Sequence, residues 1–295
     1  MNETKQIIVM TGATSGIGAE ALKHLRAEPN TEIVIGARGK SKSPEATVLP
    51  LDLSSLQSVR EFAKAVKKHL GSAKIDALVL NAGAQFRSDQ RSSDGFEMTF
   101  AVNYLAHYLL ARLLLPYMAE GSRIEITTSD THDQWPIAPK TVDPQAFAHP
   151  EKSSPARAYP ASKLCDLLLA RSLAASDEAK AQHITVVAYN PGLTGGTGLG
   201  GGSGSGGMGL KIMRPILRFV SFFVLHQLYV HTPEQSGDAL ADVVLGKVNP
   251  PSGRVYASHV RNKMTFPDPS KLAQNDEVRD RLWRESASMV GLPAA

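Results

Sequence analysis

Residues 6–18 read QIIVMTGATSGIG, and this stretch decides the fold. Its start is mainly apolar and β-branched, which is typical of a buried parallel strand. Glycines at positions 12, 16 and 18 follow, and residues 19–27 then have a helical pattern. A strand, a glycine turn and a helix place backbone N–H groups where a pyrophosphate can bind. The spacing Gly-x-x-x-Gly-x-Gly differs from the usual dinucleotide pattern, and an ordinary glycine turn is the alternative.

Strand and helix patterns alternate along the rest of the chain. We expect further strands at residues 32–37, 46–51, 77–80, 123–128, 184–189 and 254–257. We expect further helices at residues 55–70, 96–118, 158–175 and 233–245, and a polar helix near the C-terminal end. This alternation predicts a single α/β domain over residues 1–295, a Rossmann-type, doubly wound parallel sheet of about seven strands with helices on both faces.

Residues 195–231 interrupt this pattern. The glycine-rich part, residues 195–209, predicts a flexible flap. The apolar part, residues 212–228, predicts a helix over the mouth of the site, and Phe219, Phe222 and Phe223 suggest that it faces an apolar substrate. An interfacial helix on anionic lipid at residues 210–230 is the less favoured alternative, because lining a pocket explains the same apolar residues.

Composition excludes several classes of protein. The net charge of +4 is mild and the basic residues are scattered, so we expect no nucleic-acid partner. Cys165 is the one cysteine, so no intramolecular disulfide is possible, and it fits a small buried hydrophobic residue. No Cys/His spacing suggests a metal site. The N-terminus lacks a secretory pattern, and we expect a cytoplasmic protein.

The second expected strand bears on cofactor choice. In dinucleotide folds an acid at the end of this strand binds the ribose 2′-OH, whereas an arginine accommodates a 2′-phosphate. Here the strand runs into Arg38, with Lys40 and Lys42 close behind and no acid. This favours NADP(H), with a solvated basic loop as the alternative. The crossover helix expected before residue 46 is reduced to a loop, so which of the three cations meets the phosphate stays open.

Two further strand ends carry residues suited to a cofactor. Asp52 follows the third strand, either as a helix-capping acid or as an acceptor for the adenine amino group. The sequence Asn81-Ala82-Gly83 follows the fourth strand and forms a small-residue turn over which a cofactor could lie.

Tyr159 and Lys163 are four residues apart on an expected helix and therefore share one face. A unit positive charge about 4 Å from a phenol favours the phenolate by about 4 kcal/mol at an effective dielectric near 20. That would lower the pKa of the tyrosine from its usual value of roughly 10 to near physiological pH. Alone, such a pair is a weak signal, because chance pairs on solvated helices are common.

Taken together, TGATSGIG, LNAG, Asn103, Ser129, the Tyr159/Lys163 pair and NPGLT resemble, in this order, the short-chain dehydrogenase/reductase family. The resemblance covers about residues 5–260. The segments FEMTFAVNYLAHYLLARLLLP and AYPASKLCDLLLARSL are most similar to retinol dehydrogenases and protochlorophyllide reductases, a looser match. Pro160 inside the motif is tolerable only if Tyr159 lies in the first helical turn.

The resemblance implies roles for individual residues. Tyr159 is the general acid or base, Lys163 lowers its pKa and holds the nicotinamide ribose, and Ser129 binds the substrate oxygen. Asn103 holds a water that links Lys163 to solvent. Pro191, Gly192 and Thr194 hold the carboxamide end of the cofactor. The remaining cofactor contacts are assigned to Gly12, Thr14, Ser15, Gly16, Ile17, Gly18, Arg38, Asp52, Leu53, Asn81, Ala82 and Gly83.

The implied function is an NADP(H)-dependent oxidoreductase that moves a hydride between nicotinamide and a carbonyl or alcohol carbon. The expected partner is a small-molecule substrate that is apolar and fairly large for its class. A homodimer is possible, because family members are often dimers or tetramers. The alternatives are a protein that binds NADP(H) without turnover and a membrane-peripheral retinoid or lipid reductase.

Overall fold

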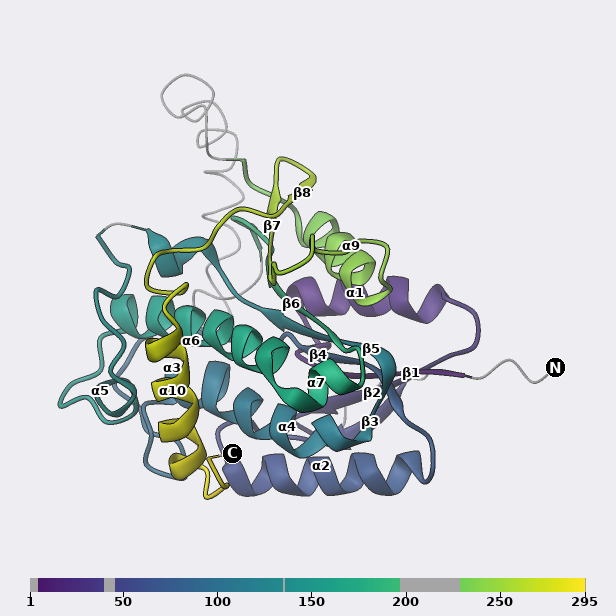
Figure 1. The fold of residues 1–295 in the computed structure, drawn as a ribbon, viewed down its shortest axis with the longest axis horizontal. Coiled ribbons are helices and arrows are strands. Elements are labelled where there is room, and N and C mark those ends of the chain that lie inside the picture. The colour runs from purple at the N-terminus through teal and green to yellow at the C-terminus, as the bar shows by residue number, and fades with distance from the viewer. Residues whose placement is uncertain (1–4, 40–45, 135, 197–228, 295) are drawn as a thin grey trace.

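The computed structural model describes residues 5–39, 46–134, 136–196 and 229–294 (Figure 1). Their strands form one eight-stranded sheet in the order β3-β2-β1-β4-β5-β6-β7-β8. Seven strands run parallel, and only the β7–β8 pair is antiparallel. The strands are β1 Gln6–Thr11, β2 Thr31–Ala37, β3 Thr47–Pro50, β4 Ile75–Leu80, β5 Met118–Thr127, β6 Thr185–Asn190, β7 Tyr256–Val260 and β8 Lys263–Thr265.

Helices cover both faces of the sheet, as the alternation predicted (Figure 1). The main helices are α1 Gly16–Ala27, α2 Leu56–Leu70, α4 Ala106–Leu114, α6 Pro155–Ala175, α9 Pro233–Val244 and α10 Asp276–Met289. Short helical segments are α3 Met98–Phe100, η1 Ala101–Leu105, η2 Leu115–Tyr117, η3 Asp130–Asp133, α5 Pro144–Ala148 and α7 Asp177–Ala181.

Two hydrophobic cores lie on opposite faces of the sheet. Alternate residues of β1 enter different cores. Ile7 and Val9 lie in the core beneath α2, α4 and α6. Ile8 and Met10 lie in the core beneath α1 and α9. This alternation follows from the period of two in a strand, and it explains why the strand is apolar on both sides. On the second face Gly237 lets α9 approach α1 closely, since a Cβ there would lie 2.8 Å from the backbone nitrogen of Ala21.

The strand order reverses between β1 and β4. The chain builds β1, β2 and β3 outward in one direction and then returns to place β4 on the other side of β1. In an open parallel sheet a ligand crevice forms at this reversal, outside the carboxyl ends of the strands. The topology therefore locates the site between the ends of β1 and β4.

Two elements of the structure differ from the sequence predictions. Strand β8 was not expected, because its two-residue hairpin turn is Arg261-Asn262 and not one of the glycine pairs that announce such turns. Both residues have positive φ, 49° and 59°. The helix expected over residues 96–118 is helical from Met98 to Tyr117, but it contains the π-helical turn η1 at Ala101–Leu105.

The start of α6 corrects a prediction about Pro160. The helix begins at Pro155 and not near residue 158, so Tyr159 lies just beyond the first turn and Pro160 is inside the helix. Pro155 suits this start because a proline at the first helical position loses no hydrogen bond. The backbone N–H of Ala158 donates to Ser154 O at 2.8 Å, which closes the first turn ahead of Tyr159.

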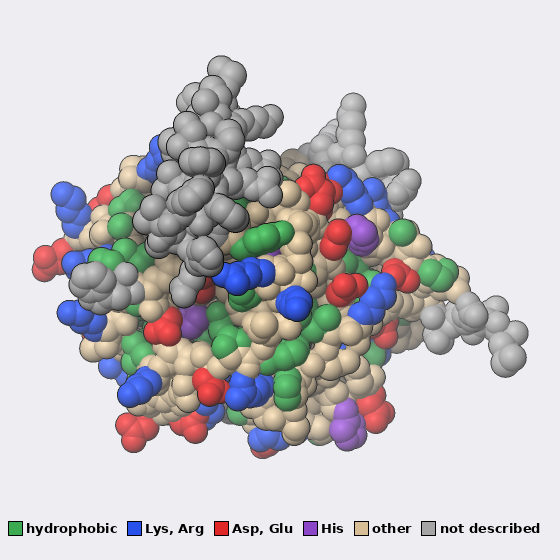
Figure 2. Space-filling model, turned by 90° about the horizontal axis from the view of Figure 1, so that it is seen from above, with side chains coloured by type: hydrophobic (Ala, Val, Ile, Leu, Met, Phe, Trp, Pro, Cys, Tyr) green, Lys and Arg blue, Asp and Glu red, His purple; other side chains and the backbone are tan. Residues whose placement is uncertain are grey.

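Several predictions fall outside the described residues. They are those on Lys40 and Lys42 and on the flap and apolar helix, including Phe219, Phe222 and Phe223. On the described part, Met98–Tyr117 is long and apolar enough to cross a membrane, yet 78% of its most apolar window is buried in the fold, as in a core helix. On the face shown in Figure 2, basic and acidic side chains are interspersed.

Candidate active site

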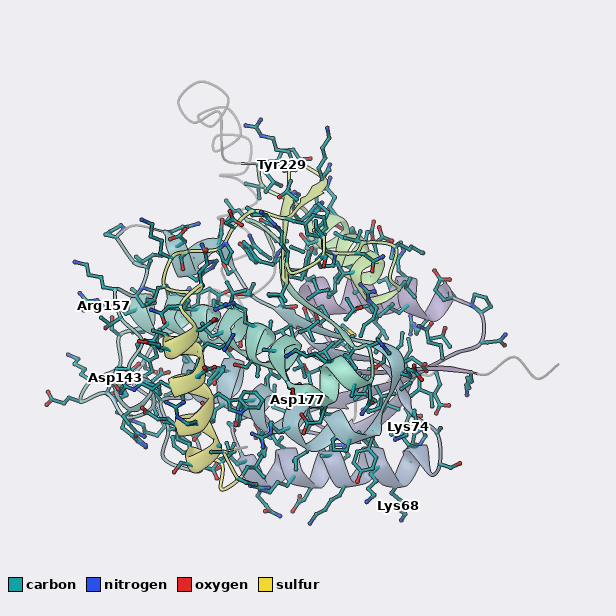
Figure 3. All side chains as sticks on the ribbon, viewed as in Figure 1. Lys68, Lys74, Asp143, Arg157, Asp177 and Tyr229 are labelled. Carbon is teal, nitrogen blue, oxygen red and sulfur yellow. The ribbon has the colours of Figure 1, made fainter. Side chains whose placement is uncertain are left out.

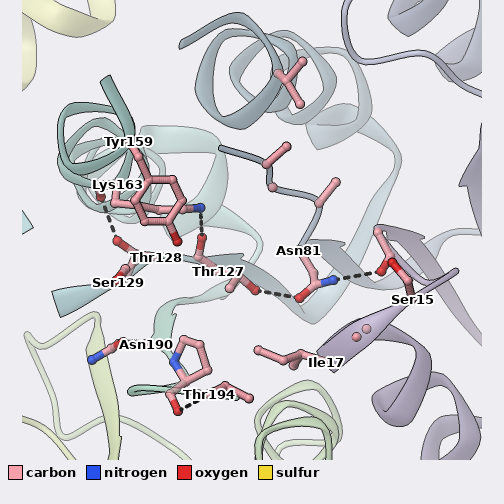
Figure 4. A pocket seen from close by; sticks show the side chains of 18 of the residues that line it. Ser15, Ile17, Asn81, Thr127, Thr128, Ser129, Tyr159, Lys163, Asn190 and Thr194 are labelled. Carbon is pink, nitrogen blue, oxygen red and sulfur yellow. Dashed lines mark hydrogen bonds between the residues drawn. The ribbon is translucent and has the colours of Figure 1, made fainter. Parts of the chain in front are cut away.

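A cavity of about 790 Å³ opens at the carboxyl ends of the strands, at the reversal of strand order. Every predicted site residue except Asn103 lines it. These are Gly12, Thr14, Ser15, Gly16, Ile17, Gly18, Arg38, Asp52, Leu53, Asn81, Ala82, Gly83, Ser129, Tyr159, Lys163, Pro191, Gly192 and Thr194. Residues far apart in the sequence thus meet in one cavity, part of which is shown in Figure 4.

The glycine turn joins β1 to α1 and packs against the end of β4. Gly12 has φ +70°, and a Cβ on Gly18 would lie 2.1 Å from the carbonyl oxygen of Gly12. The close approach at Gly18 is therefore first a requirement of the turn itself, not only of a ligand. Ser15 is the N-cap of α1, and its side chain caps none of the helix N–H groups. That leaves the helix N-terminus available to an anion.

Side-chain hydrogen bonds join the ends of three neighbouring strands (Figure 4). The Asn81 amide donates to Gly12 O at 3.1 Å, and the Thr127 hydroxyl donates to Asn81 Oδ1 at 3.2 Å. The Ala82 N–H donates to Thr11 Oγ1 at 3.2 Å. These bonds hold the ends of β1, β4 and β5 together at the floor of the cavity.

One end of the cavity is polar. Arg38 is exposed at the end of β2 and lines the cavity with Asp52 and Leu53. Asp52 Oδ1 accepts from the backbone N–H and the hydroxyl of Ser54, at 2.9 and 2.7 Å. The N-cap of α2 is Ser55, not Asp52. The capping alternative for Asp52 was therefore wrong, and its role as an adenine acceptor stays a prediction.

At the opposite end, the segment after β6 forms a wall. Gly192 has φ +68°, and a Cβ there would lie 2.6 Å from His259 O. Thr194 Oγ1 lies 2.8 Å from Ser236 Oγ, which joins this segment to α9. The ring of His231 stacks on that of His259, with centroids 4.2 Å apart. Burial, together with the charge of the neighbouring His231, lowers the pKa of His259 to about 4.

Ser129, Tyr159 and Lys163 form the central part of the site (Figure 4). Ser129 follows β5 and caps η3, accepting from the N–H of Thr131 at 3.3 Å. Tyr159 and Lys163 project from one face of α6, and Lys163 Nζ lies 5.8 Å from the centroid of the tyrosine ring. A serine hydroxyl, a phenol and an ammonium thus share one cavity. Together these groups can transfer a proton to and from a substrate oxygen.

The pKa of Tyr159 contradicts the sequence prediction. Burial raises the pKa of the phenol, and this outweighs the lowering effect of Lys163. A residue that the prediction did not consider adds to the effect of burial. Lys163 Nζ donates to Asp166 Oδ2 at 2.9 Å, and the negative charge of Asp166 raises the pKa of Tyr159 further. The spacing of three residues on one helix was a usable signal for this pair.

Asn103 lies behind the cavity and not in it. Its side-chain oxygen accepts from the N–H of Ala84 at 2.8 Å, and its amide donates to Ala84 O and Ser162 Oγ, each at 3.0 Å. Asn103 therefore ties the turn after β4 to α6, and its role in holding a water stays a prediction. It sits in the π-turn η1, whose presence the sequence did not indicate.

Two other buried polar residues contact threonine side chains at the ends of β1 and β5. His107 Nε2 lies 3.0 Å from Thr11 Oγ1, and burial lowers the pKa of His107 to about 3. Glu125, in the middle of β5, accepts from the Thr127 hydroxyl at 2.8 Å. A glutamate flanked by two isoleucines in a buried strand is the signal that could have identified it. Cys165 is fully buried, as expected.

Comparisons with known proteins agree with this geometry. The family model named short chain dehydrogenase matches residues 6–136. Retinol dehydrogenase 13 of Mus musculus is 32% identical, over 98% of this chain and 84% of that protein. Protochlorophyllide reductase A of Hordeum vulgare is 29% identical, over 97% and 80%. A solved structure of a Mycobacterium paratuberculosis protein has a TM-score of 0.71 and 22% identity, over 99% and 96%.

The fold is thus shared across the full described sheet, and the relatives span nearly the whole chain. The family resemblance noted in the sequence motifs is confirmed by the match of the family model and by the retinol dehydrogenase relative. The chain belongs to the short-chain dehydrogenase/reductase family of oxidoreductases and, within it, is similar to the retinol dehydrogenases.

Proposed function

We propose that this protein is an NADP(H)-dependent reductase or dehydrogenase that acts on a carbonyl or alcohol carbon of a fairly large apolar substrate. The observation that carries the proposal is the meeting of Ser129, Tyr159 and Lys163 with the glycine turn in one cavity. A dinucleotide cofactor would lie along the carboxyl edge of the sheet, from Arg38 to Thr194. When bound, it would supply or accept the hydride.

The residues of this chain would handle the substrate oxygen and its proton. In reduction Tyr159 would donate its phenolic proton to the oxygen, and in oxidation the phenolate would take that proton back. Ser129 would donate a hydrogen bond to the oxygen as negative charge develops there. Lys163 would hold the ribose hydroxyls of the cofactor and offset the charge of the phenolate. Replacing Tyr159 with Phe should lower kcat by about 100-fold or more and leave cofactor binding intact.

The preference for NADP(H) rests on Arg38. It is exposed at the end of β2, it lines the cavity, and no acid ends this strand. A guanidinium pairs well with a phosphate through two hydrogen bonds. Removing such a charge-assisted contact costs about 1.5–3 kcal/mol, so Arg38→Ala should weaken NADPH binding by roughly 10- to 100-fold and change NADH binding little.

The test is a titration of the purified protein with NADPH and NADH, followed by nicotinamide fluorescence. Arg284→Ala is the matched control, because Arg284 is also exposed but lies on α10, none of whose residues lines the cavity. Equal binding of both cofactors by the wild type would refute the preference. Binding of neither cofactor would refute the proposal that the protein is an enzyme of this class. Binding without turnover of any carbonyl substrate would favour the alternative, a protein that binds NADP(H) without catalysis.

An apolar substrate is supported by the rim of the cavity. Among the described residues, the large hydrophobic side chains that are exposed are Leu193, Tyr229 and Val260, and all three line the cavity. The similar proteins are named for retinol and protochlorophyllide, both bulky molecules with apolar parts. Leu193, at 52% exposure, has surface left to bury against a substrate.

Burying a leucine side chain fully is worth about 1.5–3 kcal/mol, and here about half of that remains available. Leu193→Ser should therefore raise KM for a bulky apolar ketone by roughly 3- to 10-fold and leave KM for a small ketone unchanged. An equal rise for both substrates would argue against the apolar rim.

A further inference from the structure

A buried acid lies directly beside the lysine of the site. Asp166 follows Lys163 by one turn of α6, and the side chains are 1% and 3% exposed. Asp166 Oδ2 accepts from Lys163 Nζ at 2.9 Å, while Oδ1 has no hydrogen-bond partner in the described structure. Lys163 Nζ also donates to Thr127 O at 2.8 Å. The ammonium is thus held between a carboxylate on its own helix and the end of β5.

Other titratable groups face this pair from every packed element. Glu125 faces it from β5, His107 and Tyr104 from the helix that contains η1 and α4, and Tyr159 and Cys165 from α6 itself. Asp130, after β5, acts on Tyr159 from the cavity side. At neutral pH the buried His107, Tyr104 and Cys165 carry no charge, because burial lowers the pKa of the histidine and raises the pKa of the other two.

The charge balance around Lys163 is therefore set by two buried acids. Burial raises the pKa of Asp166 to about 7 and that of Glu125 to about 8, and Lys163 opposes both shifts. Asp166 shares a hydrogen bond with the ammonium, whereas Glu125 bonds Thr127. Of the two, Asp166 is the one placed to control how much of the lysine charge Tyr159 feels.

We propose that Asp166 is a positioning residue: its ion pair holds the Lys163 ammonium against β5 and offsets its charge, so that Tyr159 keeps its proton through neutral pH. The proposal rests on the proposed function, in which that proton is the one given to the substrate oxygen. Asp166, which is outside the Ser129–Tyr159–Lys163 set, would thus keep the phenol protonated, the form that carbonyl reduction requires.

The sign of the effect follows from the geometry. A bare ammonium near a phenol favours the phenolate and lowers the pKa of the phenol, and a carboxylate paired with that ammonium works in the opposite direction. Asp166→Asn keeps the shape and one acceptor oxygen but removes the negative charge. The pKa of Tyr159 should therefore fall in this variant, because Lys163 then acts on it without opposition.

The first test needs no cofactor and no substrate. The protein is labelled with carbon-13 at the phenolic carbon of tyrosine, and the signals are followed by NMR as the pH rises. Tyr159→Phe identifies the Tyr159 signal. We expect Tyr159 to become a phenolate at lower pH in Asp166→Asn than in the wild type. Asp177→Asn, the same change at the exposed start of α7 (Figure 3), should leave the signal unmoved.

Two results would overturn the proposal. One is a Tyr159 titration in Asp166→Asn that is unchanged or moved to higher pH, which would mean that Asp166 serves to keep Lys163 charged. The other uses the wild type alone and applies even if the variant does not fold: a Tyr159 signal that titrates clearly below the free-tyrosine value of about 10.

The second test uses the reaction. In Asp166→Asn the alkaline limb of kcat for carbonyl reduction should move to lower pH, because the proton donor is lost earlier, while KM for the substrate changes little. A uniform loss of kcat at every pH would indicate a merely structural residue. Failure to bind NADPH would refute the proposed function, and the NMR titration would still decide whether Asp166 controls Tyr159.

Discussion

Replacing Lys163 with Met should be among the most destabilising single changes in this protein, and its cost should depend on pH. The side chain is 3% exposed and makes two hydrogen bonds, to Asp166 Oδ2 and Thr127 O. Removing one partner of a buried ion pair costs about 3–5 kcal/mol, because the other charge is left unpaired. The matched control is Lys23→Met, whose pair with Glu20 has the same spacing on a helix and is shorter, 2.6 Å against 2.9 Å, but is exposed. Exposed pairs contribute about 0–1 kcal/mol.

The pH dependence follows from Asp166. Its pKa in the folded protein is raised to about 7 by burial, against an ordinary value of 3.8. A carboxyl whose pKa is raised in the folded state contributes most to the free energy of unfolding at low pH. That contribution is lost as the pH rises through the folded-state pKa. Without Lys163 the carboxyl must stay protonated to still higher pH. The cost of Lys163→Met should therefore be larger at about pH 8 than at about pH 5.

Urea unfolding followed by circular dichroism measures these differences as changes in the free energy of unfolding. The double variant Lys163→Met/Asp166→Leu should be more stable than Lys163→Met alone, because no buried charge is then left unpaired. Two results would refute the reasoning: a cost for Lys163→Met no larger than for Lys23→Met, or a double variant that loses the sum of the two single losses.

Three further predictions concern packing and the turn. Gly18→Ala should weaken NADPH binding by about 10-fold or more in the fluorescence titration, because its Cβ would lie 2.1 Å from Gly12 O and 2.4 Å from Asn81 Nδ2; unchanged binding would contradict it. Gly237→Ala should lower the free energy of unfolding by about 1–3 kcal/mol, because its Cβ would force α9 away from α1; an unchanged urea midpoint would argue against the close contact. Trp283→Ala should cost about 3 kcal/mol, since the indole packs edge-on against Tyr108, with centroids 4.9 Å apart, beneath the Arg112 guanidinium; a loss no larger than that of Arg284→Ala would contradict it.

The sequence sufficed wherever a local pattern reflects a local cause. The alternation of buried strands and amphipathic helices predicted a parallel α/β sheet, because an amphipathic helix packs its apolar face on the sheet and thereby buries the strands. The glycine turn at residues 12–18 could also be predicted, because a strand, a tight turn and a helix follow one another directly in the sequence. The residues at the end of the cavity near Ser129 and Thr194 were assigned from the family resemblance, and they meet the glycine turn because parallel strands bring their carboxyl ends to one edge.

The residues that the sequence left undecided depend on contacts between distant segments. Asp52 could cap a helix or face a ligand. The structure excludes Asp52 as the cap of α2, because Ser55 occupies that position. Asn103 was assigned to the site, yet its side chain bonds Ala84 and Ser162 behind the cavity. Both outcomes depend on where other chain segments lie, which no spacing along the chain records.

The acidity of Tyr159 shows the division most clearly. The sequence by itself determined that a phenol and an ammonium share a helix face, because four residues make about one turn. Only the tertiary structure decided the direction of the pKa shift. Burial of the phenol and the pairing of Lys163 with Asp166 oppose the attraction of the lysine charge. A charge acts through its surroundings, and the dielectric and counter-ions around a side chain are set by the folded chain as a whole.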